Sequence, residues 1–186
     1  MFRYEKRLMF PVKVRKRDLK MVNTIITQYG GPDGELAAAL RYLNQRYSMP
    51  DDHGRALLTD IGTEELSHVE MVATMVHQLM AGASIEEIKE AGLGKHYGQR
   101  GFDLFPVDNF GVPFTVAYVG AVGDPVADMS ENMAAEQKAR AVYENLIDLA
   151  DDEDLIQPLL WLRERELLHF AMFKELYERY KNMEET

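Results

Sequence analysis

The sequence predicts an all-α protein in which four long helices form a bundle with one long crossover connection. Apolar residues recur at helical spacing in four long segments. Short links join the first two and the last two of these segments, so each pair is expected to be antiparallel. Between the pairs, residues 92–123 hold seven of the thirteen glycines. The length of 186 residues and the hydrophobic content of 46% fit a single domain over 1–186.

The first pair is expected to be preceded by a helix over 17–29, which the glycines at 30 and 31 end. Pro32 suits a first helical position and predicts the next helix over 32–48. Asp51 or Asp52 is expected to cap the third helix, over 52–81.

A short helix is expected to open at Ser84, where the Ser-x-x-Glu pattern is that of a capping box, and to end at 91–92. The crossover over 92–123 is predicted to be irregular, with a short strand over 113–119. Asp124 followed by Pro125 predicts the start of a helix over 124–150.

The last helix is expected over 153–180, and Pro158 predicts either a later start or a kink. The pairs are therefore 32–48 with 52–81 and 124–150 with 153–180. Two antiparallel pairs joined by one long crossover resemble a ferritin-like bundle.

Charge and composition exclude several function classes. The chain has no cysteine, so any metal must be held by nitrogen and oxygen atoms. A net charge of −10 argues against nucleic acid as a partner. The first 17 residues, however, carry +6, and the rest carry −16. We expect this segment to be an extended arm that packs on acidic surface of its own or a neighbouring subunit.

Targeting signals are not expected. Charged residues at 3, 5, 6 and 7 interrupt any apolar stretch of a secretory signal. The longest charge-free run, 109–123, is too short to span a bilayer. The sequence therefore predicts no membrane partner and a cytoplasmic location.

Six acidic and histidine residues repeat with one spacing. Glu35 precedes Glu65 by 30 residues, and His68 follows three later; Glu136, Glu166 and His169 repeat the same spacing. The midpoints of the two 30-residue intervals fall at the predicted hairpin links. In an antiparallel pair, residues equidistant from the link lie at one height, and positions i and i+3 share a helix face. Each half is therefore expected to direct two Glu and one His at one metal.

The neighbours of these residues predict that the face is buried. Several carboxylates in a core repel one another unless cations compensate them, so a dimetal centre is the interpretation that we favour. A single Glu-x-x-His on a helix is common and would carry little weight, whereas two copies at matched spacing do. His53, His77 and His96 lack this support, and we expect them to be solvated or structural.

These residues resemble the non-haem manganese catalases, in particular their short spore-coat-associated branch. The stretches that carry the likeness are 29–35, 59–71, 134–141 and 163–169, and the likeness extends over about 1–180. The resemblance implies two manganese ions, no haem, hydrogen peroxide as substrate and a homo-oligomer such as a hexamer. It also implies spore-coat proteins as partners and the spore coat as a second possible location.

Carried over by position, the resemblance implies five metal ligands: Glu35, Glu65, His68, Glu136 and His169. It implies that Glu35 bridges the metals and that Glu166 lies just outside the ligand set as a proton acceptor. Tyr42 matches a tyrosine that hydrogen-bonds near the bridge.

Two positions depart from the family pattern. Ala135 stands where studied catalases carry an arginine paired with the residue at position 166, so the proton shuttle is expected to be weaker or differently shaped. Ala56 replaces an acidic calcium ligand, and the sequence has no long C-terminal tail of the kind that helps to hold calcium, so no calcium is expected.

The implied reaction is disproportionation of peroxide by a cycle between Mn(II,II) and Mn(III,III), with Glu166 moving protons. Two alternatives remain open. One is a ferritin-like di-iron ferroxidase or peroxidase, because the ligand types suit iron as well. The other is a structural coat component in which the metals only stabilise the bundle.

Overall fold

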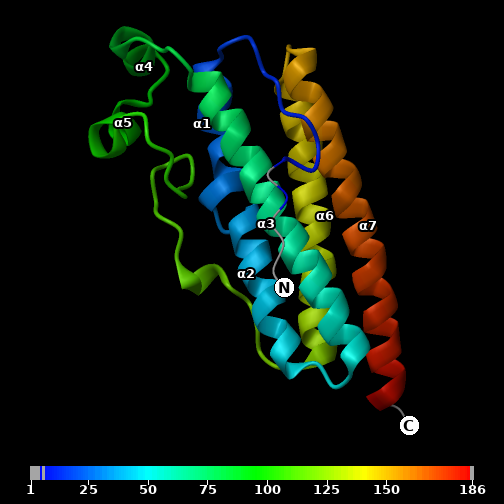
Figure 1. Ribbon diagram of the computed structural model, residues 1–186. Coiled ribbons are helices and arrows are strands. Elements are labelled where there is room, and N and C mark those ends of the chain that lie inside the picture. The colour runs from blue at the N-terminus through cyan, green and yellow to red at the C-terminus, as the bar shows by residue number, and fades with distance from the viewer. Residues whose placement is uncertain (1–4, 6, 185–186) are drawn as a thin grey trace.

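The computed structural model describes residue 5 and residues 7–184, and these form an all-α fold (Figure 1). The helices are α1 (Leu19–Gly30), α2 (Glu35–Gln45), α3 (Asp52–Met80), α4 (Ile85–Glu90), α5 (Gly94–Arg100), α6 (Pro125–Leu149) and α7 (Glu153–Glu184), with the 3-10 turns η1 (Arg46–Ser48) and η2 (Val116–Tyr118).

Two antiparallel pairs make up the bundle, as the sequence predicted. In Figure 1, α1 and α2 follow one another along α3, which runs back beside both of them. The crossover then passes down the outside of the bundle to the start of α6, and α7 returns antiparallel to α6. The described part of the chain has no helix that is long and apolar enough to cross a membrane.

Side-chain caps fix where several helices begin, and the predicted ones are confirmed. The Asp51 carboxylate accepts from the backbone N–H of Gly54 at the start of α3. Asp124 caps α6 in the same way, with Pro125 in the first turn. Ser84 and Glu87 form the reciprocal bonds of a capping box at α4. Each cap satisfies a backbone donor that the helix cannot.

The second helix does not begin where its proline predicted. Pro32 lies in a turn, and α2 begins only at Glu35, after a close approach of this turn to the end of α1. A Cβ atom added at Gly34 would lie 2.7 Å from the carbonyl oxygen of Thr27. The link therefore needs glycine, and it places Glu35 in the first turn of α2.

Two other expectations about local structure were wrong. The crossover was predicted to be irregular because of its glycines, but it contains a helix, α5. In place of the strand predicted over 113–119, there is one bridge between Val107 and Pro113, followed by η2. No second strand lies beside it in the described chain. Pro158 neither delays nor ends α7, which starts at Glu153 and contains it. Pro158 is the sixth residue of α7, so its ring costs this 32-residue helix one hydrogen bond, the one that would reach the carbonyl of Asp154.

The apolar core is divided into two clusters along the bundle. The larger contains residues of α1, the second half of α3 and the start of α7, and the smaller surrounds Tyr42, Leu58 and Phe173. Polar residues are buried within the same bundle, among them Glu35, Glu65, His68, Glu136, Glu166 and His169. An apolar frame therefore holds a set of ionisable groups away from water.

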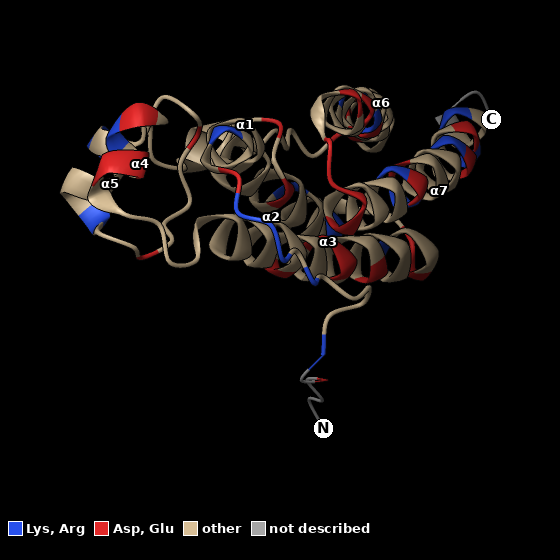
Figure 2. Ribbon diagram, turned by 90° about the horizontal axis from the view of Figure 1, so that it is seen from above, with Lys and Arg blue, Asp and Glu red and all other residues tan. Residues whose placement is uncertain are grey.

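The N-terminal arm packs on its own chain, which is one of the two arrangements predicted for it; the other was packing on a neighbouring subunit. Val14 is buried, and its backbone N–H donates to the side chain of Gln78 in α3. Arg15 binds Asp154 through two hydrogen bonds of 2.7 and 2.9 Å, and Arg17 binds Glu87 at 2.8 Å. Figure 2 shows the arm crossing beside α3, which carries several acidic residues. The basic residues Arg3 and Lys6 lie outside the described residues.

Candidate metal centre

Four helices bring the six predicted residues together. Glu35 opens α2, Glu136 lies in the middle of α6, and α3 and α7 each supply one Glu-x-x-His. Their side chains form two groups in which the candidate ligand atoms lie within 4.8 Å of one another: Glu35, Glu65, His68 and Glu166 in the first, and Glu65, Glu136, Glu166 and His169 in the second. The repeated spacing therefore predicted the neighbourhood correctly.

Glu65 lies between the two histidines. One carboxylate oxygen, Oε2, is 2.8 Å from His68 Nδ1, and the other, Oε1, is 2.7 Å from His169 Nδ1. Glu35 belongs only to the first group, with Oε2 3.5 Å from His68 Nδ1. Glu65, and not Glu35, thus lies between the two histidines, while the bridging role of Glu35 between metal ions stays a prediction. Glu136 approaches His169 Nδ1 at 3.7 Å.

Glu166 also belongs to both groups, although the resemblance implied a position just outside the set of ligands. Its Oε1 atom is 3.9 Å from His68 Nδ1 and has no hydrogen-bond partner in the described structure. Burial, together with the carboxylates of Glu136, Glu65 and Glu35, raises its pKa well above the usual range.

The electrostatics show a site that needs positive charge. Burial and the neighbouring Glu65 raise the pKa of Glu35 to about 7. Burial acts to lower the pKa of His169, but Glu65 and other carboxylates outweigh it and raise it to about 12. The pKa of His68 is raised in the same way, again chiefly by Glu65. Without metals the cluster retains protons to offset its own negative charge.

Unpartnered atoms support a fit to metal ions. Both ring nitrogens of His169 and the Oε1 atom of Glu65 are buried and have no hydrogen-bond partner among the described residues. His169 Nδ1 and Glu65 Oε1 are only 2.7 Å apart, yet their orientation makes no hydrogen bond. These atoms are placed as two ligands of one ion would be. Buried polar atoms are rarely left unpaired, and carboxylate with imidazole suits divalent transition metals.

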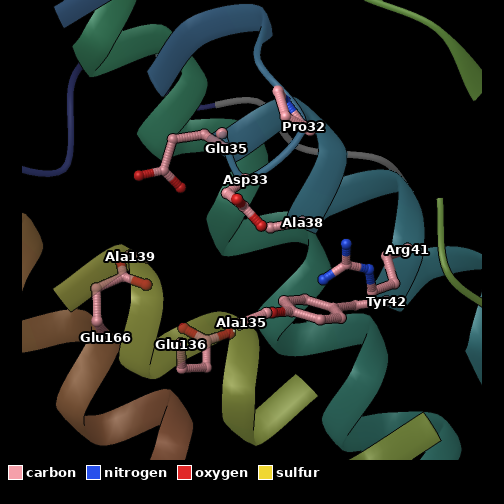
Figure 3. Close-up of a pocket in the computed structure, with 11 residues that line it drawn as sticks. Pro32, Asp33, Glu35, Ala38, Arg41, Tyr42, Ala135, Glu136, Ala139 and Glu166 are labelled. Carbon is pink, nitrogen blue, oxygen red and sulfur yellow. Dashed lines mark hydrogen bonds between the residues drawn. The ribbon is translucent and has the colours of Figure 1, made fainter. Parts of the chain in front are cut away.

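A narrow pocket leads to this cluster between α2 and α6 (Figure 3). Its free space is about 10 Å³, that of one water-sized molecule. Small residues form much of the wall, and the carboxylates of Glu35, Glu136 and Glu166 face into it; the lining residues are Pro32, Asp33, Gly34, Glu35, Ala38, Arg41, Tyr42, Ala135, Glu136, Ala139 and Glu166.

The whole of residues 1–186 matches the family described as "Manganese containing catalase". The chain belongs to the manganese catalase family. It is 54% identical to Protein CotJC of Bacillus subtilis (strain 168), a match that covers 96% of this chain and 94% of that protein. A probable manganese catalase of Clostridium acetobutylicum is 37% identical, over 98% of this chain and 82% of its own length.

Solved structures agree with this assignment. The crystal structure of wild-type KatB, a manganese catalase from Anabaena, superposes with a TM-score of 0.88 at 32% identity. The match covers 97% of this chain and 81% of KatB. The ferritin-like bundle predicted from the helix pairs is therefore confirmed, and the buried Glu/His cluster is consistent with the dinuclear metal site of this family.

Two tyrosines hold carboxylates of the manganese catalase cluster. The Tyr42 hydroxyl donates to Glu136 Oε1 at 2.5 Å, and the Tyr143 hydroxyl donates to Glu35 Oε1. Tyr42 was anticipated, whereas Tyr143 was missed. A signal for it exists in the sequence, since Tyr143 follows Glu136 by seven residues, as Tyr42 follows Glu35. Each tyrosine thus positions the glutamate of the other half.

Glu64 was also missed, although it lies next to a predicted ligand. Its two oxygens lie 3.5 Å from His68 Nε2 and from His169 Nε2, on the side away from the other carboxylates. Arg165 binds the same carboxylate at 2.5 and 3.1 Å. Burial opposes ionisation of Glu64, but His169, His68 and Arg165 outweigh it and lower its pKa. Its position four residues before His68, on the same helix face, could have revealed it.

Proposed function

We propose that this protein is a catalase that converts two molecules of hydrogen peroxide into two of water and one of dioxygen. The observation that carries the proposal is the pair of buried Glu/His groups joined by Glu65, which open onto a pocket of water-sized dimensions. Membership of the manganese catalase family supports the same activity.

Five residues would hold two manganese ions in this proposal: Glu35, His68, Glu136 and His169 at either end, and Glu65 between them. When bound, the ions would supply a two-electron cycle between the II,II and III,III states. Calcium and haem have no part in the proposed reaction.

Glu166 would move the protons. It lines the pocket, its Oε1 atom is unpartnered, and burial favours its neutral form, so it can exchange a proton with a peroxide beside it. Tyr42 would keep Glu136 in place and present its hydroxyl to the pocket. The small wall residues and the apolar frame would exclude bulk water and larger peroxides.

The direct experiment loads the protein with manganese and measures oxygen release from hydrogen peroxide. Glu166→Gln keeps the shape but cannot accept a proton, so turnover is expected to fall about 10²-fold or more while both metals stay bound. Glu164→Gln, on the exposed side of the same helix, is the matched control and should leave turnover unchanged.

Two alternatives give different results. A di-iron ferroxidase or peroxidase would be isolated with iron and release no oxygen from peroxide. A structural coat component would bind metals, yet Glu166→Gln would change neither assembly nor peroxide consumption. We include a homo-oligomer in the proposal, and light scattering would measure its size.

A further inference from the structure

Arg41 is a buried cation that the proposed reaction has not used. Only 5% of its surface is exposed, and it lines the pocket together with Tyr42 and Glu136. Figure 3 shows its guanidinium extending from α2 beside the ring of Tyr42, towards the other labelled residues. Arginine is rarely buried to this degree unless it is paired.

The pairing of Arg41 is incomplete. Its Nη2 atom donates to the backbone carbonyl of Tyr118 at 3.3 Å and lies 3.9 Å from Glu131 Oε1, a side chain that is half exposed. Its Nε atom is buried and has no hydrogen-bond partner in the described structure. A buried charged donor that is left unpaired is costly, so this atom is suited to a ligand.

Helix packing alone does not explain the arginine. The two halves of the bundle are related by an offset of 101 residues, as at Glu64 and Arg165. The counterpart of Arg41 is therefore Val142, which packs against the apolar core. The same helix position is therefore apolar in α6 and charged in α2, where Arg41 lines the pocket. Ala135, on the opposite wall, leaves the space beside Arg41 free of a second cation.

The charges of the loaded site favour an anion, a step that rests on the proposed function. Four carboxylates, those of Glu35, Glu65, Glu136 and Glu166, compare with the four positive charges of two divalent ions. Because these charges balance, the buried guanidinium of Arg41 gives the loaded pocket a net positive charge. Asp33, at the pocket, is paired with Lys138.

We propose that Arg41 is the anion-binding residue of this pocket, and that its Nε donates a hydrogen bond to a small monovalent anion, including the hydroperoxide form of the substrate. The free space of about 10 Å³ limits the ligand to one whose inner end is water-sized. Arg41 thereby determines which small molecules enter and stay beside the carboxylates.

Azide is the probe for the test, because one terminal nitrogen can accept the hydrogen bond and its infrared stretch reports its surroundings. Calorimetry and infrared spectra would measure azide binding to the manganese-loaded wild type, Arg41→Met, Arg41→Gln and the control Arg46→Gln, with metal content determined for each. We expect both Arg41 variants to bind azide at least about tenfold more weakly, with a shifted stretch, and Arg46→Gln to match the wild type.

Azide affinity and stretch that are unchanged in both Arg41 variants would overturn the inference, as would a wild type that binds no azide. Lower thermal stability of the variants with unchanged affinity would mean that Arg41 only anchors the crossover at Tyr118, and would also overturn it. The outcome is separate from catalysis: a protein that releases no oxygen but loses azide affinity with Arg41 supports the anion site while refuting the proposed function.

Discussion

Removal of the metal ions is expected to make the fold lose stability as the pH rises from 5 to 8. The reason is Glu35, whose pKa rises from 4.5 to about 7 because of burial and the neighbouring Glu65. A group with a raised pKa in the folded state stabilises the fold fully below its unfolded pKa, and this contribution is lost as the pH rises through the folded value. Glu166, His68 and His169 are shifted upwards too, so they act in the same direction.

The size of the effect follows from the shift. Between pH 5 and 8 the unfolded carboxyl is already ionised, whereas the folded one loses its proton near pH 7, so Glu35 alone contributes a loss of about 2.5 kcal/mol. The groups with lowered pKa values, Glu64 and Glu65, are ionised in both states over this range and add no slope. Metal loading supplies the positive charge instead and should abolish most of the dependence.

Urea unfolding of the chelator-treated protein, followed by circular dichroism at several pH values, measures this slope directly. The control variant Glu35→Gln cannot ionise and should show a slope smaller by about 2.5 kcal/mol over the same range. Metal-free protein that is equally stable at pH 5 and 8, or more stable at pH 8, would refute the reasoning, because the buried carboxylates would then carry no penalty for ionising.

The remaining predictions concern residues around the ligands. Tyr143→Phe removes the hydroxyl that binds Glu35 and should weaken manganese binding about 10-fold to 100-fold, whereas Tyr47→Phe, at an exposed position, should not; competition with a chelator measures both. Glu64→Gln removes the negative charge beside both Nε2 atoms and should weaken binding at both ends by a similar factor. Loss at only one end, seen as one metal retained per chain, would contradict a shared role.

The sequence was sufficient to predict the bundle and the neighbourhood of the site because both depend on periodicity. Helical spacing determines which face is buried, and a 30-residue interval centred on a link brings Glu35 opposite Glu65 and Glu136 opposite Glu166. The caps at Asp51 and Asp124 depend on one side chain and its neighbouring backbone. Such local rules hold without knowledge of the rest of the fold.

Features that depend on packing between distant segments were not predictable in this way. Pro32 lies outside α2 because the turn before Glu35 packs against the end of α1. Helix propensities describe single residues and cannot predict such a contact. The strand expected over 113–119 pairs at one residue only in the described chain, Pro113 with Val107, and a strand depends on longer pairing. The position of Glu65 between the two histidines follows from how α3 and α7 meet, since spacing alone treats Glu65 and Glu166 as equivalent.

The two sides of the site differ in a way that the internal symmetry would not require. Between α3 and α7, Glu64 and Arg165 occupy equivalent positions and bind each other, and the Glu64 carboxylate lies 3.5 Å from the Nε2 atoms of both histidines. Between α2 and α6, the equivalent positions 34 and 135, and likewise 38 and 139, hold glycine or alanine, which leaves a pocket. The ion pair therefore covers the Nε2 side of the two buried histidines. On the other side of the site, the small side chains leave room for a small molecule beside the carboxylates. The charge of Arg41 lies on this open side of the site.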